Sequence, residues 1–345
     1  MITAPQNKIH NQVTKQKIKA KVFDIAEMER RRNNSHSKSN VHQNMRLYLS
    51  YLNQTDGNIE LIGVNRDVLT RLMRLVLNFP NFKAVIEHYV QQMALQLLNE
   101  TPYFSSDPVL IIGDAGIGKT AFCQALSTVI GTPYEVLAMS TATAGFVLSG
   151  MSPSWSEGKP GKVVESLARN RVANPLLMLD EIDKASGDAR YDPIGSLYQL
   201  LENDTARNFM DEGLEITADC SYINWLATAN EQQLIPAPIL SRFTVFHVNS
   251  PTKDDMRKVI SSIYKKIIQQ NEWGRFYDKE LPVCAVDKII ESSIEPRTIQ
   301  KTIKTSCSKI ALDYVLNKRK MKRPFCVSAA YFSINEEPWK RSIGF

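Results

Sequence analysis

The chain has 345 residues, of which 43% are hydrophobic and 23% charged, which is typical of a globular protein with two or three structural units. No apolar run approaches the ~18 residues that a membrane span requires, and no signal-peptide pattern opens the chain, so we expect no membrane partner. Five scattered cysteines without a C-x-x-C pair indicate reduced thiols, a cytoplasmic location and no zinc site.

Positive charge is concentrated at the start of the chain. Residues 1–50 hold ten Lys/Arg against three Asp/Glu, a net of +7, whereas the remaining residues sum to −1. Because the tract Arg30–Asn44 is polar and lacks apolar periodicity, residues 1–50 are predicted to form a basic, flexible arm, with a marginal helix over Val13–Met28. Such an arm contacts nucleic acid or an acidic partner, or it is a solvated tail, and the sequence leaves these interpretations open.

Residues 51–106 are predicted to form a helical extension. Apolar residues recur at helical spacing over Asn65–Asn78 and over Phe82–Leu98, and Pro80 separates the two runs. We expect both helices to pack against the domain that follows instead of forming a separate site.

A glycine-rich loop follows a short apolar run at Val109–Ile112, which has the character of a buried parallel strand. Glycines let the backbone N–H groups of such a loop face an anion, Lys119 reaches the β- and γ-phosphates of ATP, and the Thr120 hydroxyl binds Mg²⁺. The pattern G-x-x-x-x-G-K-[ST] is met by Gly113, Asp114, Ala115, Gly116, Ile117, Gly118, Lys119 and Thr120.

Residues 107–250 alternate strands with helices, which predicts an α/β P-loop NTPase domain with a parallel sheet. Residues 251–335 are helical by pattern and predict a small α-helical lid, with Phe325–Val327 as a short closing strand and 336–345 as a tail. The predicted strands of the sheet are Val109–Ile112, Tyr134–Ala138, Leu176–Leu179, Ile223–Thr228 and Val245–Val248.

Two carboxylates end one of these apolar strands. Asp180 and Glu181 follow Leu176–Leu179, so a buried strand delivers both acids to the carboxyl edge of the sheet, beside the phosphate loop. Asp180 is predicted to hold the Mg²⁺ and Glu181 to act as the general base on the attacking water. Together with the phosphate loop, the acids predict a nucleotide hydrolase.

At this point the chain resembles the AAA+ module of the Lon proteases, over residues 80–335. The resemblance rests on PGKVVESL (160–167), NPLLMLDEIDKASGDARYDP (174–193), LATAN (226–230) and IPAPILSRF (235–243), beside the phosphate loop. It implies that Asn230 is the sensor-1 residue that orients the attacking water, and that Arg242 is an arginine finger for the next subunit. It also implies that Arg297 is the sensor-2 arginine of the lid, although Glu295-Pro296 replaces the family's glycine-flanked context.

The loop Ser149–Gly161 aligns with the loop that lines the ring pore in Lon, and Trp155 falls at the position of its aromatic residue. An exposed aromatic side chain grips a polypeptide by burying area, without reading its sequence. The resemblance therefore implies a hexameric ring that remodels or unfolds protein substrates. The competing interpretation is that Trp155 packs locally or against a neighbouring subunit.

The chain stops at Phe345, so the sequence leads us to expect no peptidase domain after the lid. The alternative to a remodeller is a DNA-associated AAA+ ATPase, a regulator of transposition, replication or phage defence, that uses residues 1–50 on nucleic acid. A third possibility is a scaffold in which ATP hydrolysis only times assembly.

Overall fold

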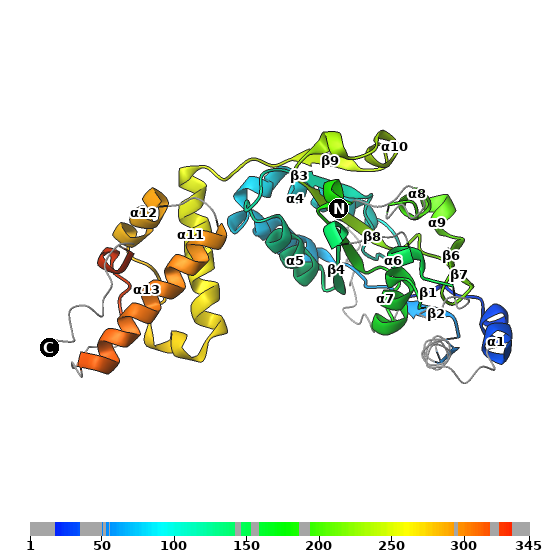
Figure 1. Ribbon diagram of the computed structural model, residues 1–345, viewed down its shortest axis with the longest axis horizontal. Helices are drawn as coiled ribbons and strands as arrows, with labels where there is room; N and C mark the ends of the chain where they lie inside the picture. The colour runs from blue at the N-terminus through cyan, green and yellow to red at the C-terminus, as the bar shows by residue number, and fades with distance from the viewer. Residues whose placement is uncertain are drawn as a thin grey trace, which may run out of the picture.

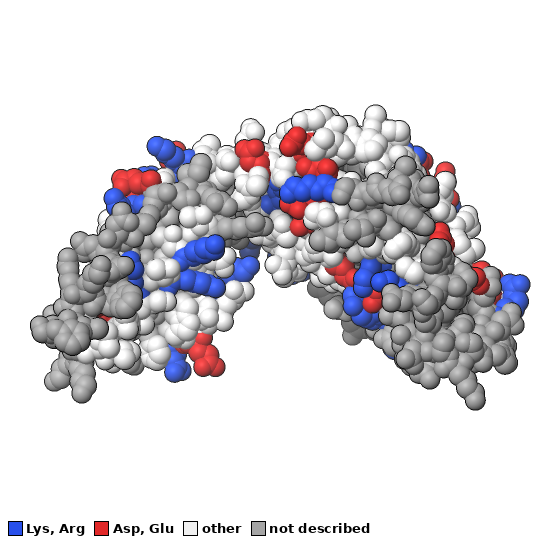
Figure 2. Space-filling view, in the orientation of Figure 1, with Lys and Arg blue, Asp and Glu red and all other residues white. Residues whose placement is uncertain are grey.

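The computed structural model describes residues 18–34, 50, 53–54, 56–141, 146–152, 159–185, 194–292, 296–317 and 324–332. The described residues form a sheet domain and a helical lid that stand at the two ends of an arch (Figure 1). Figure 2 shows the hollow between these two parts.

A five-stranded parallel sheet is the centre of the larger part. Its strand order is β4-β5-β8-β3-β9, and each strand lies within one residue of its predicted bounds, so the predicted P-loop fold is confirmed. The strands are β3 (Val109–Ile112), β4 (Tyr134–Ala138), β5 (Leu176–Asp180), β8 (Asn224–Ala229) and β9 (Thr244–His247).

Both faces of the sheet are covered, which explains why the inner strands β3, β5 and β8 are largely apolar and buried, whereas the edge strands β4 and β9 are partly exposed. On β3, Leu110 and Ile112 point into one hydrophobic core, and Val109 and Ile111 point into a second core on the opposite face. Helices α3 (Arg66–Met73), α4 (Lys83–Gln96) and α5 (Lys119–Ile130) cover the second face. The first face carries α6 (Phe146–Ser149), α7 (Lys162–Asn170), α8 (Leu197–Leu200), α9 (Asn203–Ala206), α10 (Ala237–Leu240) and the hairpin of β6 (Phe209–Asp211) and β7 (Ile216–Ala218).

The helical extension packs on the sheet domain. The 3₁₀ turns η1 (Arg74–Leu77) and η2 (Pro80–Phe82) connect α3 to α4, so the chain turns at Pro80 as predicted. The ring of Phe82 stacks on that of Phe122 in α5, with centroids 4.5 Å apart and an interplanar angle of 10°. This contact joins the extension to the helix that follows the phosphate loop.

Residues 18–34, which belong to the segment predicted as a flexible arm, form β1 (Lys19–Lys21) and α1 (Ile25–Asn34). Strand β1 pairs antiparallel with β2 (Asn58–Glu60), so the single helix predicted over Val13–Met28 is wrong from Lys19 to Asp24. The segment instead pairs with a distant strand. Its apolar residues Val22, Phe23 and Met28 are buried in the core beside the sheet.

The lid consists of α11 (Lys253–Gln270), α12 (Val283–Ser292) and α13 (Pro296–Asn317), with the 3₁₀ turns η6 (Glu272–Phe276) and η7 (Ala329–Phe332). It has a hydrophobic core of its own. Phe325 forms an isolated bridge with Tyr277 where a closing strand was predicted. Within the described part of the chain, no helix combines the length and apolarity needed to cross a membrane.

Candidate active site

The phosphate loop turns sharply between β3 and α5. Gly116 and Gly118 have positive φ angles of 84° and 101°, which glycine adopts without strain. A Cβ atom on Gly113 would overlap the carbonyl oxygen of Val248, so the close approach of these two segments also requires glycine. Ala115–Ala121 then line a cavity of about 270 Å³.

Lys119 lies folded back on this loop. Its Nζ donates hydrogen bonds to the carbonyl oxygens of Gly113 (2.5 Å) and Asp114 (3.1 Å) and to Oδ1 of Asn230 (2.7 Å). Burial lowers the pKa of Lys119, while carboxylates that include Asp183 and Asp180 raise it in opposition. The ammonium group is therefore held among acceptors that an incoming phosphate oxygen would replace.

Asp180 and Glu181 stand at the carboxyl end of β5, as predicted, and a side chain from β8 connects them. Thr228 Oγ1 donates to Asp180 Oδ1 (2.7 Å) and accepts from the backbone N–H of Glu181 (3.1 Å). Glu181 has a left-handed backbone (φ 55°), and its carboxylate Oε1 lies 2.6 Å from Lys184 Nζ. The hydrogen bond from Lys184 is the main cause that holds the pKa of Glu181 below its ordinary value.

Asn230 follows β8, the strand that lies between β5 and β3. Asp183 fixes this corner, because its Oδ2 accepts the N–H groups of Asn230 and Glu231, both at 3.0 Å. Asp183 is buried and its Oδ1 has no hydrogen-bond partner among the described residues. Asn230 is thereby aimed at Lys119 through a backbone that a buried carboxylate holds in place.

The sequence analysis missed Thr228 and Asp183. The signal for Thr228 is a hydroxyl inside the otherwise apolar stretch Trp225–Ala229, since a buried polar side chain must have a partner. Asp183 gives a weaker signal, because a carboxylate in a turn after a strand is common.

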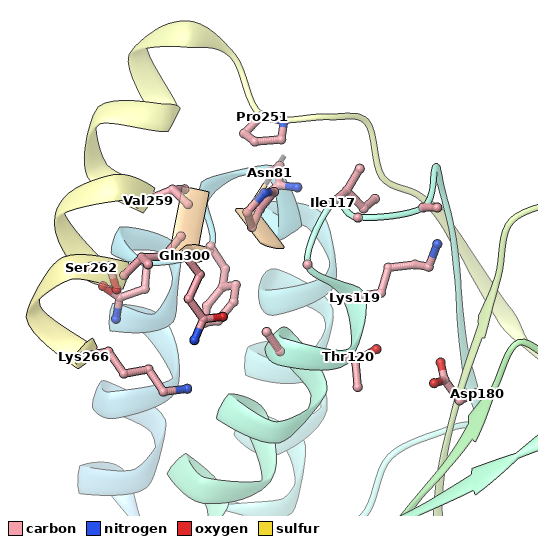
Figure 3. Close-up of a pocket in the computed structure, with 18 of the residues that line it drawn as sticks. Asn81, Ile117, Lys119, Thr120, Asp180, Pro251, Val259, Ser262, Lys266 and Gln300 are labelled. Atoms are coloured by element: carbon pink, nitrogen blue, oxygen red, sulfur yellow. The ribbon is translucent and has the colours of Figure 1, made fainter. Parts of the chain in front are cut away.

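The cavity is a cleft between the sheet domain and the lid. Its floor includes Asp180, Glu181 and Asn230. Figure 3 shows Ser262 and Lys266 of α11 and Gln300 of α13 on the lid side, across from Lys119 and Thr120. The remaining wall comes from the extension, through Asn78, Phe79 and Asn81, so this segment adds to the site as well as packing on the domain.

Arg297 is the second residue of α13, but its side chain lies outside the described residues. Pro296 and Gln300 of the same helix line the cleft, so the first turn of α13 faces it. Trp155 also lies outside the described residues, although both ends of its loop are described.

Arg242 is not among the residues that line the cleft. Its Nη2 lies 3.0 Å from Glu202 Oε1, its Nη1 donates to the Pro238 carbonyl, and its guanidinium carbon lies 5.5 Å from the ring centre of Tyr198. Its buried Nε has no hydrogen-bond partner among the described residues. Arg242 therefore lies outside the cleft. The side chains expected to serve hydrolysis that do line the cleft are Lys119, Thr120, Asp180, Glu181 and Asn230.

A parallel sheet with a phosphate loop, two acids at the neighbouring strand end and a helical lid defines the P-loop nucleotide hydrolase class. Residues 109–250 match the model of the ATPase family associated with various cellular activities (AAA). The chain thus carries an AAA-type ATPase domain.

Among AAA proteins the chain resembles Lon. It is 26% identical over 306 residues to the Lon protease of Buchnera aphidicola subsp. Schizaphis graminum, which covers 87% of this chain and 37% of the relative. It is 28% identical over 241 residues to the Lon protease of B. aphidicola subsp. Acyrthosiphon pisum (69% and 30%), and 28% identical over 215 residues to that of Escherichia coli K12 (61% and 27%). The chain therefore spans about a third of the length of these curated relatives.

Proposed function

We propose that this protein is a Mg²⁺-dependent ATPase that assembles into a ring, a hexamer, and uses hydrolysis to remodel or unfold protein substrates. The observation that carries the proposal is the division of the site: phosphate-binding and acidic side chains share one cleft, and Arg242 lies outside it. A second copy of the chain would have to supply this arginine.

The side chains in the cleft fit ATP and Mg²⁺. Thr120 and Asp180 offer oxygen donors, which Mg²⁺ prefers, and Thr228 holds one oxygen of Asp180. Bound Mg²⁺ neutralises charge on the phosphates. In this proposal the loop Gly113–Gly118 and Lys119 hold the phosphates, Glu181 accepts the proton of the attacking water, Asn230 orients that water, and Arg297 contacts the nucleotide from the lid.

Arg242 is proposed to act in the site of the next subunit. Its side chain is 22% exposed and lies beside α8 and α9, where Glu202 and Tyr198 contact it. An arginine that reaches the γ-phosphate from a neighbour stabilises the charge of the transition state. This raises kcat by a factor of roughly 10³–10⁵. Because each copy offers one surface and needs another, the contact is head-to-tail. Such contacts form a ring when the rotation between neighbours closes, and the proposal takes this closed form.

Mixing two inactive variants tests this arrangement. Arg242→Ala lacks the finger and Glu181→Gln lacks the base, so each alone is expected to hydrolyse ATP at a small fraction of the wild-type rate. In an equal mixture about a quarter of the interfaces pair an intact Glu181 with an intact Arg242, so activity returns in the mixture. A mixture as inactive as its components, with exchange of subunits verified, would reject the shared site.

The protein substrate is proposed from the relatives, which are proteases by name. Unfolded casein is expected to stimulate the ATPase, and Trp155→Ala is expected to abolish the stimulation without lowering the basal rate. Trp273→Ala is the matched control, because Trp273 is a partly exposed tryptophan in the lid. Stimulation that survives Trp155→Ala would reject the pore-loop assignment. Hydrolysis that no protein stimulates would favour a scaffold in which hydrolysis only times assembly.

A second candidate function, nucleic-acid binding, is favoured by one observation. Residues 251–345 hold 19 Lys/Arg against 11 Asp/Glu, a net of +8, and Lys301 and Lys304 are exposed on α13. Figure 2 shows cationic side chains of the lid on the side that faces the hollow. Duplex DNA would then stimulate the ATPase, with an affinity that falls steeply with salt and with Lys301→Glu or deletion of residues 1–50. Binding that none of these changes weakens would reject this candidate.

A further inference from the structure

A buried carboxylate joins the two ends of the loop that contains Trp155. Asp211 ends β6 and is fully buried. Its Oδ2 accepts the N–H of Gly161 (2.8 Å), at the far end of the loop, and its Oδ1 accepts the N–H of Leu214 (2.7 Å), in the hairpin turn. A single side chain thus links the hairpin β6–β7 to the start of α7.

The near end of the loop rests on the same turn. The N–H of Glu212 donates to the Ser149 carbonyl (2.7 Å), and Met151 and Lys159 close the loop with two backbone hydrogen bonds, at 2.8 and 3.1 Å. Both ends of the loop are therefore held at one point of the hairpin.

Three glycines make this contact close. A Cβ atom on Gly150 would lie 2.7 Å from the Gly213 nitrogen and 3.0 Å from Asp211 Oδ1. A Cβ on Gly161 would overlap the Leu148 carbonyl, and one on Gly213 would overlap that of Lys159. Backbone packs on backbone around the carboxylate, and an apolar residue at position 211 would leave the buried N–H groups of Gly161 and Leu214 unpaired.

We propose that Asp211 is the positioning residue of the loop 149–161: it fixes both described ends of the loop on the β6–β7 hairpin, and the response of the ATPase to a polypeptide depends on this attachment. This inference rests on the proposed remodelling function. Burial penalises the charge of an ionisable group, so a buried aspartate does not by itself stabilise a junction of backbone segments. Asp211 offsets this cost because it accepts the hydrogen bonds of Gly161 and Leu214.

The group is also sensitive to pH. Burial raises the pKa of Asp211 to about 7, against the hydrogen bonds from Leu214, Gly161 and Gly213, which lower it. The other titratable groups that act on it or are affected by it are Glu212, on its own hairpin, and the buried thiol of Cys220. Near neutral pH the carboxylate and carboxylic acid forms are both populated.

The test compares the full-length chain with Asp211→Asn, with the exposed neighbour Glu212→Gln as the control. The amide hydrogens of Gly161 and Leu214 are expected to exchange roughly tenfold faster or more in Asp211→Asn, because a hydrogen bond to each is weakened or lost. The casein-stimulated part of the ATPase is expected to fall roughly tenfold while the basal rate stays within about twofold, since no residue of the cleft is changed.

A pH series separates positioning from general destabilisation. In the wild type the stimulated rate divided by the basal rate is expected to change between about pH 6 and 8, and in Asp211→Asn this change disappears. Should Asp211→Asn fail to fold, Gly213→Ala displaces the loop and keeps the carboxylate, and the same loss of stimulation is expected.

Unchanged exchange at Gly161 overturns the inference, as does stimulation that survives in Asp211→Asn. If casein does not stimulate even the wild type, the proposed function fails; the exchange and its pH dependence then decide the role of Asp211 independently.

Discussion

Thr228 holds Asp180 by a 2.7 Å hydrogen bond from the buried centre of the sheet. The same hydroxyl accepts the N–H of Glu181, so one side chain of β8 fixes both acids that end β5. The geometry of the site therefore depends on how β5 and β8 pair.

Thr228→Val keeps the shape of the side chain and removes its hydroxyl. We expect kcat to fall roughly ten- to hundredfold, and more Mg²⁺ to be needed for half-maximal rate, because a hydrogen bond to Asp180, the proposed metal ligand, is lost. A Mg²⁺ titration of the ATPase measures both effects. Thr228→Ser keeps the hydroxyl and is expected to stay within a few-fold of wild type; equal losses in the two variants would mean that packing, and not the hydrogen bond, matters.

Lys184→Ala removes the partner of Glu181. Lys184 holds the pKa of Glu181 below its ordinary value, so removing it raises that pKa toward the ordinary range. Because a general base must be ionised, the acid limb of the kcat profile is expected to move to higher pH. The profile is measured at saturating ATP, with Lys184→Arg as the charge-keeping control. If the acid limb does not move, Lys184 does not control the ionisation of the catalytic base.

Phe82→Ala tests how firmly the helical extension is joined to the sheet domain. Its ring stacks on Phe122 and is fully buried, so we expect the free energy of unfolding to fall by about 3–5 kcal/mol. Urea unfolding measures the change. Leu98→Ala, at an exposed end of the same extension, is expected to change stability by less than about 0.5 kcal/mol. Similar losses in the two variants would show that the extension is not held by this stack.

The stability of the wild type relative to Asp211→Asn should depend on pH. Folding raises the pKa of Asp211 from its ordinary 3.8 to about 7, so between these values the folded state binds more protons than the unfolded state. The contribution of the carboxyl group is therefore present below pH 4 and is lost as the pH rises through 7. Chemical unfolding of both proteins from pH 4 to 8 measures the difference; a constant difference would contradict the buried, titrating carboxyl.

The sequence predicted those parts of the fold that local patterns determine. Strands β3 and β5 are apolar runs because both of their faces are buried, and the phosphate loop has a spacing that few other structures require. Asp180 and Glu181 follow from the same logic, since parallel strands end at one edge.

What the sequence did not predict depends on contacts between distant segments. Strand β1 exists because β2 pairs with it, although the local spacing favours a helix. Thr228 and Asp183 acquire their roles only when β8 lies beside β5, and Asn78–Asn81 reach the cleft only when α3 and α4 pack on α5. Local patterns do not identify these partners, although the hydroxyl of Thr228 in an apolar stretch indicates that a partner exists.

The cleft between the sheet domain and the lid has a mechanical consequence. The lid has its own hydrophobic core, and the chain enters it through the short segment Val248–Thr252. A molecule that fills the cleft contacts the phosphate loop on one side and α11 and α13 on the other. It therefore connects the sheet domain to the lid, which have separate hydrophobic cores. The angle between the two would then be set by what occupies the cleft, and emptying it would release the lid to turn about a hinge of a few residues.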